Sequence, residues 1–110
     1  MAHHQDKMDA VFDLVRMIPA GRVSTYGAIA AAIGLKSGAR WVGYCMNLSH
    51  QVVPKVPAHR VVNSAGLLTG RHHFTPPEQM QLLLEQEGVT VVDHQVKNFK
   101  KLLWEPLVEL

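Results

Sequence analysis

The sequence predicts a mainly α-helical domain with a small β element, arranged as a winged-helix-like domain around a helix-turn-helix. Apolar residues recur at helical spacing in several segments, glycine and proline separate these segments, and two short valine-containing stretches indicate strands. The 110 residues, of which 47% are hydrophobic, are enough for one domain and too few for two. We therefore expect one domain that spans residues 1–110.

The first expected helix covers residues 6–17. Its apolar side chains recur at the spacing of one helix face and are Met8, Val11, Phe12 and Val15. Pro19 disfavours a helical conformation at Ile18, so we expect the helix to end before this pair.

Two further helices, joined by a short link that contains glycine, form the candidate helix-turn-helix. Ser24 and Thr25 offer an N-cap for the first of them, and Gly34 suits its C-terminal cap. The second is expected over residues 39–47, with an inner face of Ala39, Val42, Cys45 and Met46 and an outer face of Arg40, Gly43, Tyr44 and Asn47. The pattern fits a helix-turn-helix, and it also fits a plain helical hairpin.

Shorter elements are expected in the second half of the chain. Residues 60–63 and 89–92 indicate strands, residues 49–55 and 69–74 indicate loops, and residues 97–104 form the closing segment. Thr75 and Glu78 have the spacing of a capping box, at the start of a helix that ends at Gly88.

Charge is unevenly distributed, although the formal net charge is only +2. No carboxylate side chain occurs in the 64 residues from Leu14 to Pro77. That stretch carries four histidines and seven cations, which are Arg16, Arg22, Lys36, Arg40, Lys55, Arg60 and Arg71. Unless it arises by chance in so short a chain, this distribution indicates a polyanionic partner, most simply a nucleic acid.

Cysteine content and hydropathy exclude several classes of protein. The single cysteine, Cys45, excludes an internal disulfide and a zinc site built from several cysteines, and we expect it to be a buried structural residue. No apolar run is long enough to span a bilayer, and the polar N-terminus shows no signal peptide. The histidine pairs at positions 3–4 and 72–73 lack a third ligand, so we expect no metal and no cofactor.

Taken alone, His59 and Arg60 indicate a structural pair that satisfies backbone groups where the chain enters the core. A set of motifs in order along the chain is more specific: Gly21-Arg-Val-Ser-Thr-Tyr-Gly27, Ala39-Arg40-x-Val42-Gly43, Pro57-x-His-Arg-Val-Val62, Asn63-x-x-Gly66 and Glu85-x-Glu87-Gly88. With these motifs, the chain resembles the C-terminal, DNA-binding domain of the O6-alkylguanine-DNA alkyltransferases over nearly its whole length. The resemblance implies the fold of that domain.

One position departs from the pattern of the family. The alkyltransferases carry Pro-Cys-His-Arg-Val, in which the cysteine takes the alkyl group, and this chain has Ala58 in place of the cysteine. A methyl group is not a nucleophile, so we expect no transfer reaction. In this respect the chain resembles the alkyltransferase-like proteins, which bind alkylated guanine without repairing it and signal to nucleotide excision repair. Most of those proteins have tryptophan where this chain has Ala58.

The resemblance also implies DNA-binding residues. Tyr26 matches the tyrosine that presses on the 3′ phosphate and rotates the target nucleotide, and Arg40 matches the arginine that replaces the extruded base in the stack. Without the resemblance, Tyr26 also fits a core aromatic residue, and Arg40 fits a surface arginine on a phosphate. The full expected set, read in the minor groove, is Ser24, Thr25, Tyr26, Arg40, Gly43 and Tyr44.

A pocket for alkylguanine is implied around Ala58. Its expected walls are the loop 69–74 and the side chains of Tyr26, Pro57, Ala58, Val61 and Arg71, with Arg71 over the purine face. His59 and Glu87 match the pair that activates the cysteine in the transferases. In this chain we expect no catalytic residue, and the pair becomes a vestigial network that orients the pocket. Because a buried carboxylate requires a partner, Glu87 is expected to point inward, towards His59 or Arg60.

The sequence thus predicts one function and leaves two alternatives. The predicted function is non-enzymatic recognition of O6-alkylguanine in duplex DNA by a monomer that flips the nucleotide, with nucleotide excision repair proteins as partners and no membrane. The first alternative is a methylated-DNA–protein-cysteine methyltransferase domain inactivated by a natural or engineered loss of its cysteine. The second is a helix-turn-helix regulator that reads a DNA sequence. We expect a cytoplasmic protein, nucleoid-associated when bound to DNA, or a nuclear one in a eukaryote.

Overall fold

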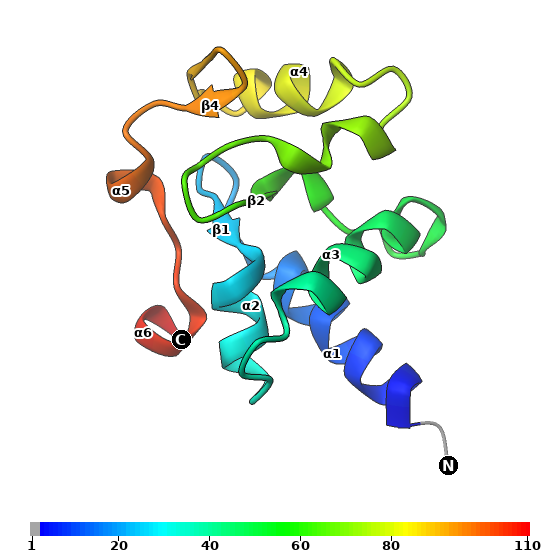
Figure 1. Cartoon of the computed structure of the whole chain (residues 1–110). Helices are drawn as coiled ribbons and strands as arrows, with labels where there is room; N and C mark the ends of the chain where they lie inside the picture. Colours follow the sequence, from blue (N-terminus) through cyan, green and yellow to red (C-terminus); the bar gives the residue numbers. More distant parts are fainter. Residues whose placement is uncertain (1–2) are drawn as a thin grey trace.

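The computed structural model describes residues 3–110, and their side chains from residue 6 onward (Figure 1). Most of its regular structure is helical. The α-helices are α1 (His3–Arg16), α2 (Tyr26–Ala32), α3 (Ala39–Leu48), α4 (Gln79–Gln86), α5 (Phe99–Leu102) and α6 (Pro106–Glu109). Short 3₁₀ helices are η1 (Ser49–Gln51), η2 (Ala58–Arg60) and η3 (Thr69–His73).

Two small sheets accompany the helices. β1 (Ser24–Thr25) pairs in parallel with β2 (Val61–Val62), and β3 (Val91–Val92) pairs antiparallel with β4 (Gln95–Val96). The predicted combination of mainly helical structure with a small β element is therefore confirmed. None of the described helices is both long enough and apolar enough to cross a bilayer.

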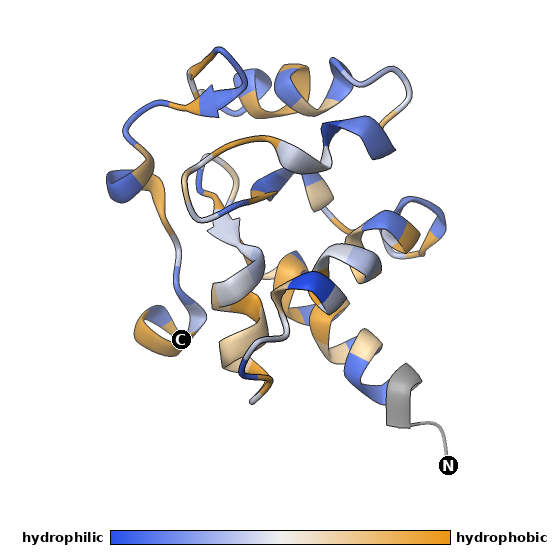
Figure 2. Ribbon diagram, in the orientation of Figure 1, coloured by the Kyte–Doolittle hydropathy of each residue, from blue (hydrophilic) through white to orange (hydrophobic). Residues whose placement is uncertain are grey.

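The chain forms two layers, each with its own apolar cluster (Figure 1). The first cluster lies among α1, α2 and α3 and includes Val11, Ile29, Val42 and Trp104. The second lies under α4 and the β3–β4 hairpin and includes Met80 and Leu84. Figure 2 shows the apolar sides of these helices turned towards the interior. Because β1 and β2 connect the layers, residues 57–62 lie between them.

Helices α2 and α3 pack against each other and are joined by the link 33–38 (Figure 1). The predicted N-cap is confirmed, because the Thr25 hydroxyl accepts a hydrogen bond of 3.0 Å from the backbone N–H of Ala28. Gly34 has a φ of +77°, the left-handed conformation expected of a glycine after a helix. The predicted faces of α3 are also found, with Val42, Cys45 and Met46 buried and the outer face more exposed.

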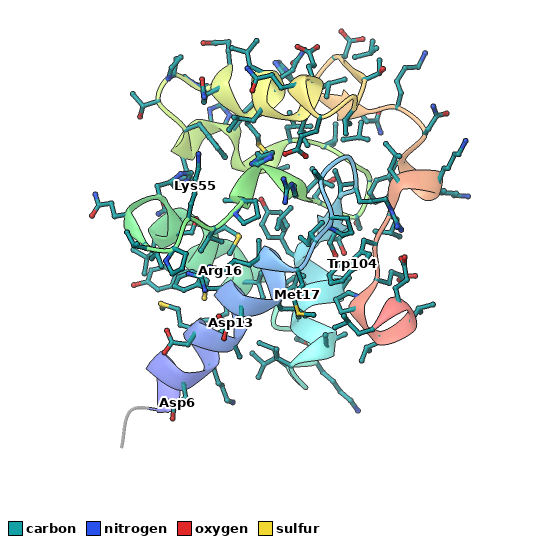
Figure 3. The ribbon with its side chains drawn as sticks, turned by 180° about the vertical axis from the view of Figure 1, so that it is seen from behind. Asp6, Asp13, Arg16, Met17, Lys55 and Trp104 are labelled. Atoms are coloured by element: carbon teal, nitrogen blue, oxygen red, sulfur yellow. The ribbon has the colours of Figure 1, made fainter. Side chains whose placement is uncertain are left out.

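Arginine side chains tie the loops to the helices. Arg16, at the end of α1, donates a hydrogen bond of 2.7 Å to the carbonyl of Pro54 and pairs with Asp13 at 2.8 Å (Figure 3). This contact fixes the loop that leads to Ala58. Arg22 donates to the carbonyls of Leu102 and Leu103, so the C-terminal segment is held against the strand region.

One local prediction is wrong, and some short elements were not predicted. The capping box at Thr75 is absent, since α4 begins at Gln79 with Glu78 as its N-cap and without a side-chain cap. Instead, the N–H groups of Gln79 and Met80 bond the carbonyls of Pro76 and Pro77 in a preceding turn. Strands β1 and β4 were not predicted because they lack the valine pairs that indicated β2 and β3, and the four residues of α6 are too few for a helical pattern.

The Thr25 cap gives a test of the α2 start. We expect Thr25→Ala to lower the free energy of unfolding by about 1 kcal/mol, because it leaves the Ala28 N–H without its partner. Thr25→Ser keeps the hydroxyl and should retain most of the stability. Urea unfolding of the three proteins measures the difference, and equal midpoints for wild type and Thr25→Ala would contradict the capping role.

Candidate nucleic-acid interface

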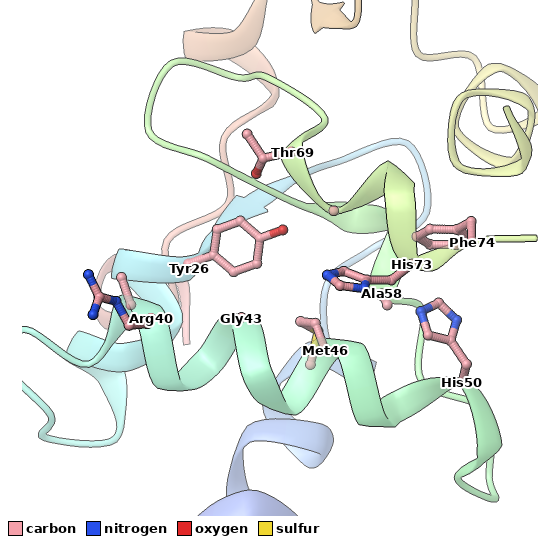
Figure 4. Close-up of a pocket in the computed structure, with 11 residues that line it drawn as sticks. Tyr26, Arg40, Gly43, Met46, His50, Ala58, Thr69, His73 and Phe74 are labelled. Carbon is pink, nitrogen blue, oxygen red and sulfur yellow. The ribbon is translucent and has the colours of Figure 1, made fainter. Parts of the chain in front are cut away.

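A hollow of about 360 Å³ opens between α2, α3, η2 and η3. Its volume lies within the range of small-molecule sites, about 300–1,000 Å³. Figure 4 shows α3 forming one side and η3 the other. The residues that line it are Tyr26, Ala39, Arg40, Gly43, Met46, His50, Ala58, Thr69, Gly70, His73 and Phe74.

The Tyr26 ring lies in this hollow between two glycines. A Cβ atom at Gly43 of α3 would lie 3.9 Å from the ring, and one at Gly70 of η3 would lie 2.8 Å from the hydroxyl oxygen. The absence of a side chain at Gly70 therefore leaves room for the Tyr26 hydroxyl, whereas a Cβ at Gly43 would make an ordinary van der Waals contact with the ring. Burial raises the pKa of Tyr26, and the Thr69 side chain partly offsets this effect. The hydroxyl consequently stays protonated at neutral pH and is available as a hydrogen-bond donor.

The outer face of α3 borders the hollow. Arg40 is exposed at the start of the helix, and Tyr44 is 55% exposed. Figure 4 shows Arg40 at the end of the hollow next to Tyr26. The structure thus brings Tyr26, Arg40, Gly43 and Ala58 together around one opening, as predicted.

Glu87 joins three segments directly behind Ala58. Its carboxylate accepts hydrogen bonds from the Arg60 guanidinium, the shortest at 2.7 Å, and from the backbone N–H of Gly21 at 3.1 Å. The His59 Nε2 lies 2.7 Å from Oε2, the carboxylate oxygen that also accepts the shortest Arg60 hydrogen bond. Arg60 also donates to the carbonyl of Ile18 at 2.9 Å. The expected inward orientation of Glu87, towards both His59 and Arg60, is confirmed.

The ionisation of this network follows from burial and hydrogen bonding. Burial alone would raise the pKa of Glu87, but hydrogen bonds from Arg60, His59 and Gly21 outweigh it and lower the pKa to about 2. Burial lowers the pKa of His59, although Glu87 acts in the opposite direction. Glu87 is therefore ionised and His59 neutral at neutral pH.

Three of the residues predicted to line the alkylguanine pocket do not line the hollow. Val61 is 0% exposed and packs in the first apolar cluster as part of β2, so it does not line the hollow. Pro57 precedes Ala58 but contributes no wall. Arg71 donates to the Leu68 carbonyl at 3.0 Å and borders a different, smaller hollow with Glu78. The reason is that η3 turns Thr69, Gly70 and His73 towards the opening and Arg71 away from it.

Ser24 also differs from its predicted role. It is 0% exposed, and its hydroxyl has no hydrogen-bond partner among the described residues. Its pairing with Val61 in the β1–β2 sheet places it inside the molecule. Thr25 is partly exposed, and its hydroxyl is engaged as the N-cap of α2.

Sequence reasoning missed the pocket roles of Met46 and His50. Ala39, Gly43, Met46 and His50 follow one another at intervals of four, three and four residues, which is the repeat of a single helix face. Extending the expected helix by one turn would have added His50, whereas Met46 already lay within it and was assigned to the inner face. The His50 ring also meets the Phe74 ring edge-on, with centroids 4.6 Å apart.

The remaining thiol lies outside the hollow. Cys45 is 0% exposed on the inner face of α3, and burial raises its pKa to about 11. It is thus a buried, protonated thiol, in agreement with the structural role predicted for it. No cluster of three metal-ligating side chains occurs among the described residues, which do not include the side chains of His3 and His4.

Comparison with known proteins identifies the family. Residues 6–89 match the model for the DNA-binding domain of 6-O-methylguanine DNA methyltransferase. The chain belongs to this family. Alkyltransferase-like protein 1 of Schizosaccharomyces pombe is 38% identical over 100 residues, which cover 87% of this chain and 92% of that protein. Its crystal structure in complex with damaged DNA containing O6-carboxymethylguanine superposes with a TM-score of 0.78 over 93% of this chain and 97% of that chain, at 38% identity.

Two other relatives differ in how much of their length this family domain occupies. The DNA base-flipping protein of Vibrio parahaemolyticus is 34% identical over 97 residues, or 87% of this chain and 93% of that protein. The bifunctional methyltransferase/endonuclease of Thermoplasma volcanium is 33% identical over 98 residues, which cover 88% of this chain and only 30% of that protein. The likeness to the alkyltransferase-like structure confirms the predicted alkyltransferase helix-turn-helix fold and decides against a plain helical hairpin.

The Glu87 network makes a prediction about acid stability. Because the pKa of Glu87 is about 2 in the folded protein against an ordinary value of 4.5, its contribution is present above pH 4.5 and is lost as the pH falls towards 2. We expect Glu87→Gln to lower the free energy of unfolding by about 2–3 kcal/mol at neutral pH and to flatten the acid part of its pH dependence. Urea unfolding at a series of pH values from neutral down to about pH 2 measures both the stability difference and the acid part of the profile.

Glu85→Gln on the same helix is the matched control. Glu85 is exposed and accepts a hydrogen bond only from Gln81, at 3.1 Å, so this change should be nearly neutral. The same acid profile in both variants would contradict the assignment to Glu87.

Proposed function

We propose that this protein binds O6-alkylguanine in duplex DNA from the minor groove, extrudes the nucleotide into the hollow beside Tyr26, and leaves the alkyl group in place. The lesion is then marked for nucleotide excision repair by partner proteins, with the chain acting as a monomer. The observation that carries this proposal is Ala58, which lines the hollow next to an intact His59–Glu87 network but offers only a methyl group. A site shaped to receive a base without a nucleophile recognises the base and does not react with it.

The position of the only thiol supports the absence of transfer. A cysteine reacts as its thiolate, and the pKa of Cys45 is about 11 because the side chain is buried. Cys45 is also not among the residues that line the hollow. It therefore does not substitute for the nucleophile missing at position 58.

The distribution of charge supports DNA as the partner. Arg40 and Tyr44 are exposed on the outer face of α3, within the long stretch of sequence that carries cations and no carboxylates. Gly43 lies between them and permits a close approach of the helix backbone to a sugar-phosphate wall. One relative named for base flipping, and another solved with O6-carboxymethylguanine in DNA, support the lesion as the target.

Tyr26 and Arg40 test the flipping step. We expect Tyr26→Ala and Arg40→Ala each to weaken binding to a duplex with one O6-methylguanine by about 10–100-fold, because each removes a stacking or hydrogen-bonding contact worth about 1–3 kcal/mol. Fluorescence anisotropy measures the affinities, and circular dichroism checks that the fold is intact.

Lys100→Ala removes one positive charge from α5, outside the hollow, and is the matched control for Arg40→Ala. It should lower affinity for damaged and plain duplex alike. Wild-type affinity in both the Tyr26 and the Arg40 variant would overturn the flipping assignment.

The intact network beside Ala58 favours one second candidate, a methyltransferase domain that has lost its cysteine. The hydrogen bond of 2.7 Å between His59 and Glu87 keeps the arrangement that the family resemblance assigns to cysteine activation. On this alternative the protein in its present form is inactive and has no preference for the lesion.

The variant Ala58→Cys tests whether the site keeps the geometry needed for methyl transfer. We expect this variant to accept the methyl group from O6-methylguanine in DNA, which a mass increase of one methylated cysteine on the protein would report. Ala58→Ser is the control, since a hydroxyl at this position is a far weaker nucleophile. Preferential binding of O6-methylguanine over guanine by the unaltered protein supports the recognition function, and equal binding supports the inactivated enzyme.

A further inference from the structure

A second hollow, of about 280 Å³, adjoins the first at Ala58. The two hollows share four lining residues, His50, Ala58, His73 and Phe74, so these residues form the wall between them. Figure 4 shows the imidazoles of His50 and His73 close to Ala58, between the end of α3 and η3. Ala58 contributes only a methyl group to this wall, and a larger residue there would fill the space between the hollows.

All titratable side chains that line the second hollow are basic. Among the described residues these groups are Lys55, His50, His59 and His73, and no carboxylate lines the hollow. Glu87 contacts His59 from behind, and its charge is compensated by Arg60. Lys55 is exposed and makes no ion pair within the described part of the chain.

We propose that the second hollow receives the acidic end of O6-alkyl groups that carry a terminal carboxylate on a tether long enough to pass Ala58. This inference rests on the proposed function, because it requires an extruded alkylguanine in the first hollow. It assigns a substrate class, acid-terminated adducts, to residues that the flipping step does not use. Lys55 and the two imidazoles are the donors that face the carboxylate.

The physical basis is charge-assisted hydrogen bonding. A carboxylate placed between Lys55, His50 and His73 accepts hydrogen bonds from them. These bonds are stronger than those that a neutral group of the same shape, such as an amide, accepts from the same donors. Each hydrogen bond to a charged group is worth enough for about a tenfold change in affinity. The acid should therefore bind about tenfold more tightly than its amide.

Binding of the acid should also take up a proton. Burial lowers the pKa of His50, and the charges of His73 and Lys55 lower it further. A bound carboxylate opposes these two charges and favours the protonated imidazole. The other groups near this space are His59 with Glu87 behind it, and Tyr26 and Arg40 along the first hollow. Affinity for the acid should consequently rise as the pH falls from about 8 to about 6, while affinity for the amide stays constant.

The test uses three duplexes, with O6-methylguanine, O6-carboxypropylguanine or its amide O6-carbamoylpropylguanine, each in competition with plain guanine. The measured quantity is the ratio of affinities for acid and amide, because it cancels general changes in DNA binding. Lys55→Gln should reduce this ratio from about ten towards one and leave binding of O6-methylguanine over guanine unchanged. Lys36→Gln makes the same charge change at a different hollow, beside Trp41, and should leave the ratio at about ten.

A second variant tests whether the adduct passes Ala58 from the first hollow into the second. Ala58→Trp should remove the preference for the acid by filling the wall between the hollows. Equal affinity of the wild type for acid and amide, with O6-methylguanine still preferred over guanine, would overturn this inference and leave the proposed function intact. An equal fall of the acid-to-amide affinity ratio in Lys36→Gln and Lys55→Gln would also overturn this inference. If none of the three adducts is preferred over guanine, the proposed function fails, and this inference fails with it.

Discussion

The carboxylate of Glu87 is the point at which segments distant in the sequence meet. It holds Arg60 and His59 from η2 and the backbone of Gly21, while Arg60 reaches on to the carbonyl of Ile18. A partly buried carboxylate with this many donors is stable as an anion, and each donor is fixed in return. The short helix that carries Ala58 is thus anchored from one side by α4 and from the other by the turn after α1. The position of the hollow depends on this anchoring.

The hydrogen-bond network of His59, Arg60 and Glu87 has no nucleophile to activate in this chain. A neutral histidine beside an ionised glutamate is arranged to accept or relay a proton, yet Ala58 has none to give. The remaining property is rigidity: His59 and Arg60 keep η2 in place, so the pocket is formed before any ligand arrives. A preformed pocket suits recognition because little ordering cost is added when the base enters.

The lining of the pocket combines space with positive charge. The glycine at position 70 leaves room for the Tyr26 hydroxyl, and Ala58 leaves room beyond it. Arg40 lies at one end of the hollow and the histidines lie at the other. Of the seven cations in the stretch without carboxylates, Arg40 lines this hollow, while Arg16, Arg22 and Arg60 form ion pairs elsewhere in the fold.

Much of the fold was determined by the sequence alone, because its signals are local. The faces of α1 and α3, the Thr25 cap and the Gly34 terminus follow from periodicity and from the conformations that single residues favour. Ala58, Tyr26 and Arg40 were found through motifs, and Glu87 through its place on an otherwise apolar helix face.

Only the tertiary structure decided which residues surround the hollow. Arg71 and His73 are two residues apart, yet the η3 turn directs them to different hollows. Val61 is removed from the pocket by strand pairing, and His50 is brought into it by one more turn at the end of α3. Such outcomes depend on how separate segments pack, and a linear sequence encodes them only through contacts between residues far apart along the chain.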